Sequence, residues 1–157
     1  MPYTATSPTL TFCDKLAAVI AAAWNPTAPS AVLRCYQFTF DTEATTGRRV
    51  YVMPTDYGNE PATRSEDDWR HKVTVVIAER YTVAGEVSTE WIDERVDFVY
   101  DRIVDGLDYS HAGPLVWSGR SVLTLGADVE VCDLDTLRTK KTFWSVVNLE
   151  FLEILNA

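Results

Sequence analysis

The stretch over 140–155 constrains the fold most, because apolar side chains occupy both of its alternating faces. One face carries Phe143, Val147, Leu149 and Phe151, and the other carries Trp144, Val146, Leu152 and Ile154. A strand with one face in water alternates apolar and polar residues, whereas a strand covered on both sides is apolar throughout. We therefore expect a long, central strand with a layer of protein on each side of its sheet.

Helical and strand periodicities divide the rest of the chain into a short series of elements. They predict, in chain order, a helix over 8–24, strands over 32–41 and 48–53 joined as a hairpin, a long loop over 55–68, a strand over 69–82, a helix over 88–105, a loop over 108–120, short strands over 121–125 and 128–132, and a turn over 133–138. Ser88 is the expected N-cap of the second helix, whose apolar stripe runs from Ile92 to Ile103.

This series predicts the α+β class. We expect one domain over 1–157, with a mostly antiparallel sheet of four to five strands and two helices packed on one face. The other face is also rich in aromatic and aliphatic residues, but no third helix is predicted to cover it. Because a single domain seldom leaves such a face in water, we expect another copy of the chain or a partner protein to cover it.

Charge and cysteine content limit the class of function. Lys and Arg number 14 against 23 Asp and Glu, a net charge of −9 that argues against a broad nucleic-acid-binding face. Three cysteines without a C-x-x-C pair favour reduced thiols over disulfides or zinc. The first residues lack the pattern of a signal peptide, and the longest apolar run, 16–24, is much shorter than the roughly 20 residues of a membrane span. We expect no membrane partner.

The sequence shows no constellation of catalytic residues. His71 and His111 lie in different contexts, a strand and a loop, and His71 is expected at the surface of its strand. Asp133 and Asp135 could hold a divalent ion, but an aspartate-stabilised turn is the commoner use of such a pair. We therefore expect no enzyme, no cofactor and no metal site.

Two aromatic residues of the second helix are candidates for an interaction site. Trp91 and Phe98 lie beside its apolar stripe, next to Arg95 and Arg102. Two interpretations are open: the rings fill a broad core groove, or they form an exposed anchor pair framed by the arginines, as at the centres of interfaces.

Arg48 and Arg49, at the tip of the predicted hairpin, are also candidates. They are either solvated or in contact with the acidic helix of a neighbouring copy. That helix carries six acids on its far side: Glu90, Asp93, Glu94, Asp97, Asp101 and Asp105. Surface helices are usually charged on that side, so a solvated helix face is the more common interpretation and an electrostatic role is the less common one.

Three segments carry a resemblance to a known family. The first helix ends in Ala-Ala-Ala-Trp-Asn-Pro at 21–26, the acidic helix reads Trp-Ile-Asp-Glu-Arg-Val-Asp-Phe-Val-Tyr-Asp-Arg-Ile at 91–103, and Thr-Phe-Trp-Ser-Val-Val-Asn-Leu-Glu-Phe stands at 142–151. Together with the order of elements, they give a chain that resembles the tail terminator (tail-completion) proteins of long-tailed bacteriophages. The resemblance covers most of the chain, but not 55–68 or 108–120.

The resemblance implies a virion structural protein, assembled in the host cytoplasm as a homohexameric ring. Such a ring caps the tail tube, ends its polymerisation and joins the tail to the neck. The implied partners are the tail tube protein, a neck or connector protein on the head side and, in a contractile tail, the sheath. DNA would only pass through the ring.

An acidic lumen would let DNA slide, because it repels phosphate. Two sets of acids are candidates for its lining: Asp93, Asp97 and Asp101 on the second helix, and Asp128, Glu130, Asp133 and Asp135 before the final strand.

Three alternative functions are open. The first is another head–tail connector or head-closure protein of the neck. The second is a small-ligand α+β enzyme or binding module, with a pocket at His71 or at Asp133 and Asp135. The third is a regulatory protein whose acidic face mimics DNA.

Overall fold

The computed structural model describes residues 8–22, 31–36, 47–55, 69–105 and 120–155. The predicted loop over 55–68 lies outside these ranges except for Thr55. The segment 108–119 and His111 lie wholly outside them, as do the predicted ends of the first helix and first strand, at 23–24 and 37–41.

Within the described residues, the fold is α+β, as predicted. Five strands form one sheet in the order β1-β2-β3-β5-β4. Their bounds are β1 (Ala31–Arg34), β2 (Arg48–Pro54), β3 (Trp69–Arg80), β4 (Arg120–Glu130) and β5 (Thr142–Leu155). All neighbours pair antiparallel except β1 and β2. The final strand β5 lies between β3 and β4, which confirms its predicted place inside the sheet.

The predicted hairpin is wrong. Strand β1 pairs parallel with β2, so that Ala31 faces Arg49 and Arg34 faces Val52. Alternation of apolar and polar residues predicts a strand and its two faces, but it contains no information about the direction in which two strands pair. Arg48 and Arg49 therefore begin a strand beside the parallel β1 rather than lying at a hairpin tip.

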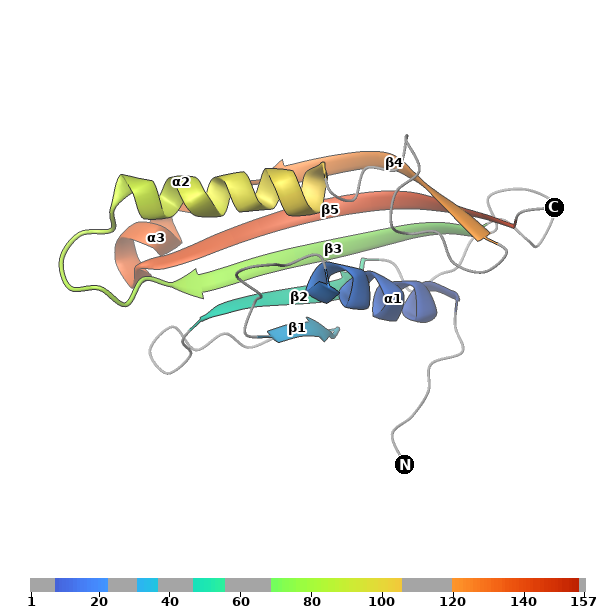
Figure 1. Cartoon of the computed structure of the whole chain (residues 1–157), viewed down its shortest axis with the longest axis horizontal. Coiled ribbons are helices and arrows are strands. Elements are labelled where there is room, and N and C mark those ends of the chain that lie inside the picture. The colour runs from blue at the N-terminus through green and yellow to red at the C-terminus, as the bar shows by residue number, and fades with distance from the viewer. Residues whose placement is uncertain (1–7, 23–30, 37–46, 56–68, 106–119, 156–157) are drawn as a thin grey trace, which may run out of the picture.

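Helices α1 (Pro8–Ala22) and α2 (Thr89–Phe98) pack on the same face of the sheet (Figure 1). Phe12, Leu16 and Ile20 of α1 join one buried cluster with Val99 and Ile103, which follow α2. Ser88 caps α2 as predicted, because its side chain accepts a hydrogen bond from the Trp91 backbone N–H at 3.1 Å.

The second helix continues past Phe98 as a π-helical segment, η1 (Val99–Val104), which the sequence does not predict. Its wider turn is marked by a hydrogen bond of 2.7 Å from the Asp105 N–H to the Tyr100 carbonyl. Phe98 and Val99 are both buried, although they are adjacent in sequence.

Two predictions near the C-terminus need correction. The predicted turn over 133–138 is a short helix, α3 (Leu134–Lys140), so the described chain has three helices of the α type rather than two. The two short strands predicted over 121–125 and 128–132 are one strand, β4, with an irregular register between Thr124 and Gly126. A bulge of this kind interrupts the alternation from which strands are predicted.

The two faces of the sheet differ in how well they are covered. On the helix side, Phe143, Val147, Leu149 and Phe151 of β5 are buried, as predicted. On the other side, which we call the outer face, a smaller cluster contains buried Tyr51, Val76 and Ala78 and half-buried Cys35, Met53, Trp144 and Val146. The outer face also carries large apolar side chains that remain exposed: Leu33 on β1 and Leu123 on β4.

His71 is not at the strand surface as predicted but fully buried. Its ring stacks on Phe12 at a centroid distance of 4.4 Å, and its Nδ1 lies 3.1 Å from the Thr9 hydroxyl. Its Nε2 lies 3.7 Å from a carboxylate oxygen of Glu153, which is also buried. These contacts connect α1 to β3 and β5. His71 is therefore a polar residue with a structural role at a position of β3 that faces the core.

Candidate functional site

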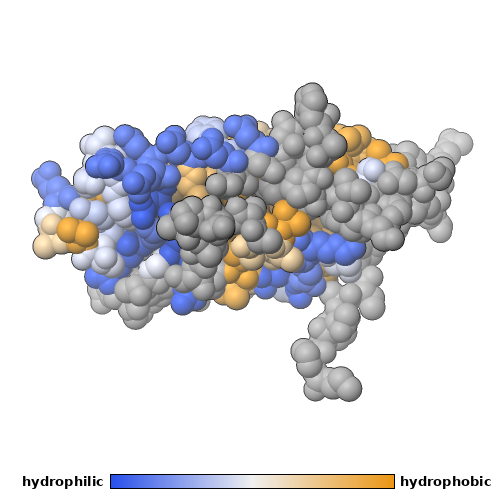
Figure 2. All heavy atoms as spheres, in the orientation of Figure 1, coloured by the Kyte–Doolittle hydropathy of each residue, from blue (hydrophilic) through white to orange (hydrophobic). Residues whose placement is uncertain are grey.

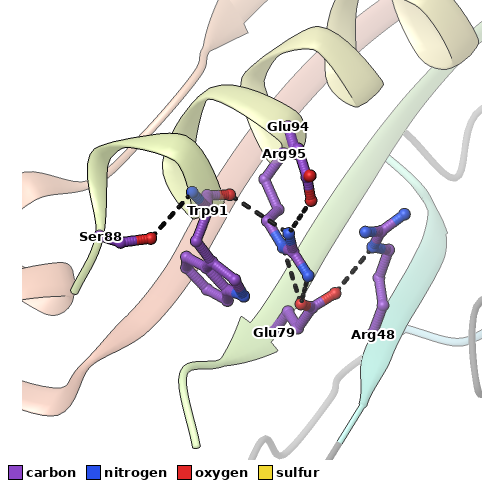
Figure 3. A network of polar contacts seen from close by, with 6 residues as sticks. All are labelled: Arg48, Glu79, Ser88, Trp91, Glu94 and Arg95. Carbon is purple, nitrogen blue, oxygen red and sulfur yellow. Dashed lines mark hydrogen bonds and ion pairs between the residues drawn. The ribbon is translucent and has the colours of Figure 1, made fainter. Parts of the chain in front are cut away.

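A network of charged side chains joins α2 to the sheet (Figure 3). Glu79, near the end of β3, is opposite Arg48 of β2 in the antiparallel register and accepts a hydrogen bond of 2.8 Å from its Nε. The same carboxylate accepts two hydrogen bonds from Arg95 of α2, at 2.8 and 2.5 Å. Arg95 also donates to Glu94 and to the Trp91 carbonyl. One nearly buried acid thus holds two arginines from different elements.

Each arginine of this network also lies over an aromatic ring of α2. The guanidinium carbon of Arg48 lies 4.3 Å from the centre of the Phe98 ring, and that of Arg95 lies 4.3 Å from the Trp91 ring. Trp91 in turn packs edge-on against Tyr81, with centroids 5.1 Å apart. Cation–π contacts of this kind gain strength where solvent is excluded.

The interpretation of Trp91 and Phe98 as an exposed anchor pair is therefore wrong. Phe98 is a buried member of the main core cluster, and Trp91 is half-buried against it. The apolar side of the helix is broad enough to take both rings, so the alternative of a wide core groove is correct. Arg95 does not frame an exposed site, because it points back to Glu79 (Figure 3). The Arg102 side chain lies outside the described residues.

Arg48 and Arg49 have different environments, because neighbouring residues of a strand point to opposite faces. Arg48 is on the helix side and is held by Glu79 and Phe98. Arg49 is on the outer face, beside Ala78 in the register. Its Nε atom is buried and has no hydrogen-bond partner in the described part of the chain.

Glu79 is the network residue that was not predicted from the sequence. The signal was present: positions 71, 73, 75 and 77 of β3 all point inward, so alternation places Glu79 on the buried face as well. A carboxylate on a buried face requires a cationic or hydrogen-bonding partner.

The acids of α2 form an exposed surface. Glu90, Asp93, Glu94, Asp97, Asp101 and Asp105 are all exposed, and we call them the acidic surface. Figure 2, drawn from the helix side of the sheet, shows hydrophilic side chains over this helix. The structure therefore leaves the first set of candidate lumen acids accessible.

The second set of acids divides into two parts. Asp128 and Glu130 are exposed on β4, on the outer face of the sheet. Asp133 instead caps α3, accepting hydrogen bonds from the backbone N–H groups of Asp135 and Thr136 at 3.0 and 3.2 Å. Hydrogen bonds from Thr136, followed by the one from Asp135, lower the pKa of the Asp133 carboxyl. Asp135 is exposed in the first turn of α3.

Among the described residues, no three His, Cys, Asp or Glu side chains come together as a group that could hold a metal ion. No described helix has both the length and the apolar character needed to cross a bilayer. The sequence matches no protein-family model and shows no significant similarity to curated proteins.

Proposed function

We propose that this protein is a structural subunit of a bacteriophage tail, a tail terminator that forms a homohexameric ring. The ring caps the tail tube, ends its polymerisation and joins the tail to the neck while DNA passes through. The proposal starts from the resemblance of 21–26, 91–103 and 142–151 to the tail terminator family.

One structural observation supports it most. The sheet carries apolar side chains on both faces, while the described helices α1 and α2 cover one of them. On the outer face, Leu33 is 43% exposed and Leu123 is 40% exposed, and these two residues lie on the two edge strands. Exposed apolar side chains at both edges of one face favour contacts with other protein subunits. A ring supplies such contacts, because each subunit has a neighbour on either side.

The experiment is an assembly assay with the full chain. Native mass spectrometry should find a six-fold species, and electron microscopy should show rings with an open centre. Added to polymerising tail tubes, the protein should shorten them and lie at their ends. A protein that stays monomeric at high concentration and does not bind tubes would refute the proposal.

A neck connector or head-closure protein is the second candidate, because it would use the same outer face in a ring. The position of the labelled subunit in the particle separates the two functions. A tail terminator lies directly on the last ring of the tube, whereas a connector lies on the portal side.

A further inference from the structure

A group of cations on the outer face and the acidic surface of α2 lie on opposite sides of the subunit. On the outer face, the charged residues that β2 and β3 contribute within their described ranges are all cations: Arg49, Arg70, Lys72 and Arg80. The acidic surface lies beyond the other face, on α2. The cations form two groups, Arg49 and Arg80 near the end of β3 and Arg70 and Lys72 near its start.

Arg49 lies beside the apolar cluster of the outer face. It is two residues from buried Tyr51 and opposite buried Ala78, whose other neighbour is Trp144. Burial raises the pKa of the Tyr51 hydroxyl, and the charge and hydrogen bond of Arg49 oppose that rise. Arg49 therefore has a hydroxyl as its neighbour, while the described residues provide its buried Nε with no acceptor.

A guanidinium in apolar surroundings is stabilised by a carboxylate more than by any neutral group. On the helix side, Arg48 has such a carboxylate partner, because its Nε donates a hydrogen bond of 2.8 Å to Glu79. On the outer face, the acids of β4 and β5 are Asp128, Glu130 and Glu150. Glu150 is paired with Arg70 at 3.3 Å and is opposite Lys72 in the register.

We propose that the cations of the outer face, with Arg49 towards the end of β3 and Lys72 towards its start, bind the acidic surface of α2 on a second copy of this chain. The inference rests on the proposed ring and names the surfaces through which its subunits meet. The occupant is a second copy because the same chain presents an exposed acidic surface of complementary charge.

The placement of the two surfaces determines the symmetry of the contact. Because they lie on opposite sides of the sheet, one subunit can bind a neighbour on each side at once. Such a head-to-tail contact closes into a ring when its rotation permits, whereas a two-fold dimer would require one self-complementary surface. The contact also takes Asp93, Asp97 and Asp101 out of the set of candidate lumen acids.

Charge reversal tests both surfaces. Arg49→Glu and Lys72→Glu change the outer face, and Asp97→Lys changes the acidic surface. Lys72 and Asp97 are exposed, so these two variants keep the test valid if Arg49→Glu fails to fold. Arg138→Glu on α3 and Glu86→Lys before α2 are matched controls, because both residues are exposed outside the two surfaces. Circular dichroism and thermal melting establish that each variant is folded.

Native mass spectrometry over a dilution series measures assembly. Each surface variant alone should raise the midpoint concentration for ring formation by at least about tenfold, since like charges then face each other at every contact. An equimolar mixture of Lys72→Glu and Asp97→Lys should restore rings with equal numbers of the two variants. In an alternating ring, every contact is then either native or a reversed pair of opposite charges.

The outcomes separate this inference from the proposed function. Rings that form equally well from the wild type and all three surface variants would overturn the inference, while tube capping by those rings would keep the function. Equal weakening by the two controls, or failure of the mixture to reassemble, would also overturn it. A wild type that neither assembles nor binds tubes would refute both proposals.

Discussion

Replacing Glu79 with glutamine tests the charged network beneath α2. The substitution keeps the shape of the side chain but removes the negative charge shared by Arg48 and Arg95. The three side chains are only 9%, 12% and 14% exposed, so water cannot take over the lost contacts without rearrangement. Both guanidinium groups would stay largely buried, with a neutral acceptor in place of a carboxylate.

The expected cost follows from this burial. Removing one partner of a buried ion pair typically costs about 3–5 kcal/mol, because the remaining charge is left uncompensated. We expect about 3 kcal/mol for Glu79→Gln, at the lower end, because glutamine still accepts a hydrogen bond and Arg95 keeps its bonds to Glu94 and the Trp91 carbonyl. For a chain of this size, that corresponds to a melting temperature lower by roughly 6–12 °C.

Urea unfolding followed by far-ultraviolet circular dichroism measures the free energy of unfolding for each variant. Glu94→Gln is the matched control, because Glu94 contacts the same Arg95 at 2.9 Å but is 66% exposed. It should lose at most about 1 kcal/mol, as exposed ion pairs do. If Glu79→Gln loses no more than Glu94→Gln, the network does not stabilise the packing of α2 on the sheet.

Three further predictions concern other parts of the fold. Phe98→Ala should lower the free energy of unfolding by about 3–5 kcal/mol in denaturant titrations, because it empties a core position, and a stable variant defective only in assembly would contradict this. Burial raises the pKa of Cys13 to about 12, so a thiol reagent at pH 8 should label Cys13 only after unfolding. The unfolded chain loses this proton near pH 9, so stability should fall as pH rises from about 9 towards 12, and Cys13→Ala should flatten that part of the curve. Asp133→Ala should lower the melting temperature at neutral pH. The difference from wild type should disappear as pH falls below about 3.8, because protonation ends the capping by this carboxylate, and a difference that persists in acid would exclude this role.

The elements with regular periodicity could be predicted from sequence. Alternation identified β3 and β5, and the apolar stripe with Ser88 at its start identified α2. These signals are local, because side-chain direction in a strand or helix follows from backbone geometry alone. They failed where geometry changes within an element, at the β4 irregularity and at the π-helical end of α2.

The candidate site needed contacts between distant residues. Arg48 and Glu79 are 31 positions apart, and Glu79 and Arg95 are 16 apart, so their network depends on strand register and on the placement of α2. The positions of Trp91 and Phe98 on the helix were compatible with burial or exposure, and only the packing of α2 against the sheet decided between them. Likewise, the parallel pairing of β1 with β2 depends on the tertiary structure and could not be predicted from the pattern of either strand.

The sequence by itself determined the α+β class, the long strand with two apolar faces and the exposed acids of the second helix, because each depends on the spacing of residue types along one element. Only the tertiary structure decided that Arg48 is neutralised within the subunit while Arg49 is on the outer face. The physical reason is that the partner of a charged side chain is set by which elements meet in space, and neighbours in sequence do not specify that.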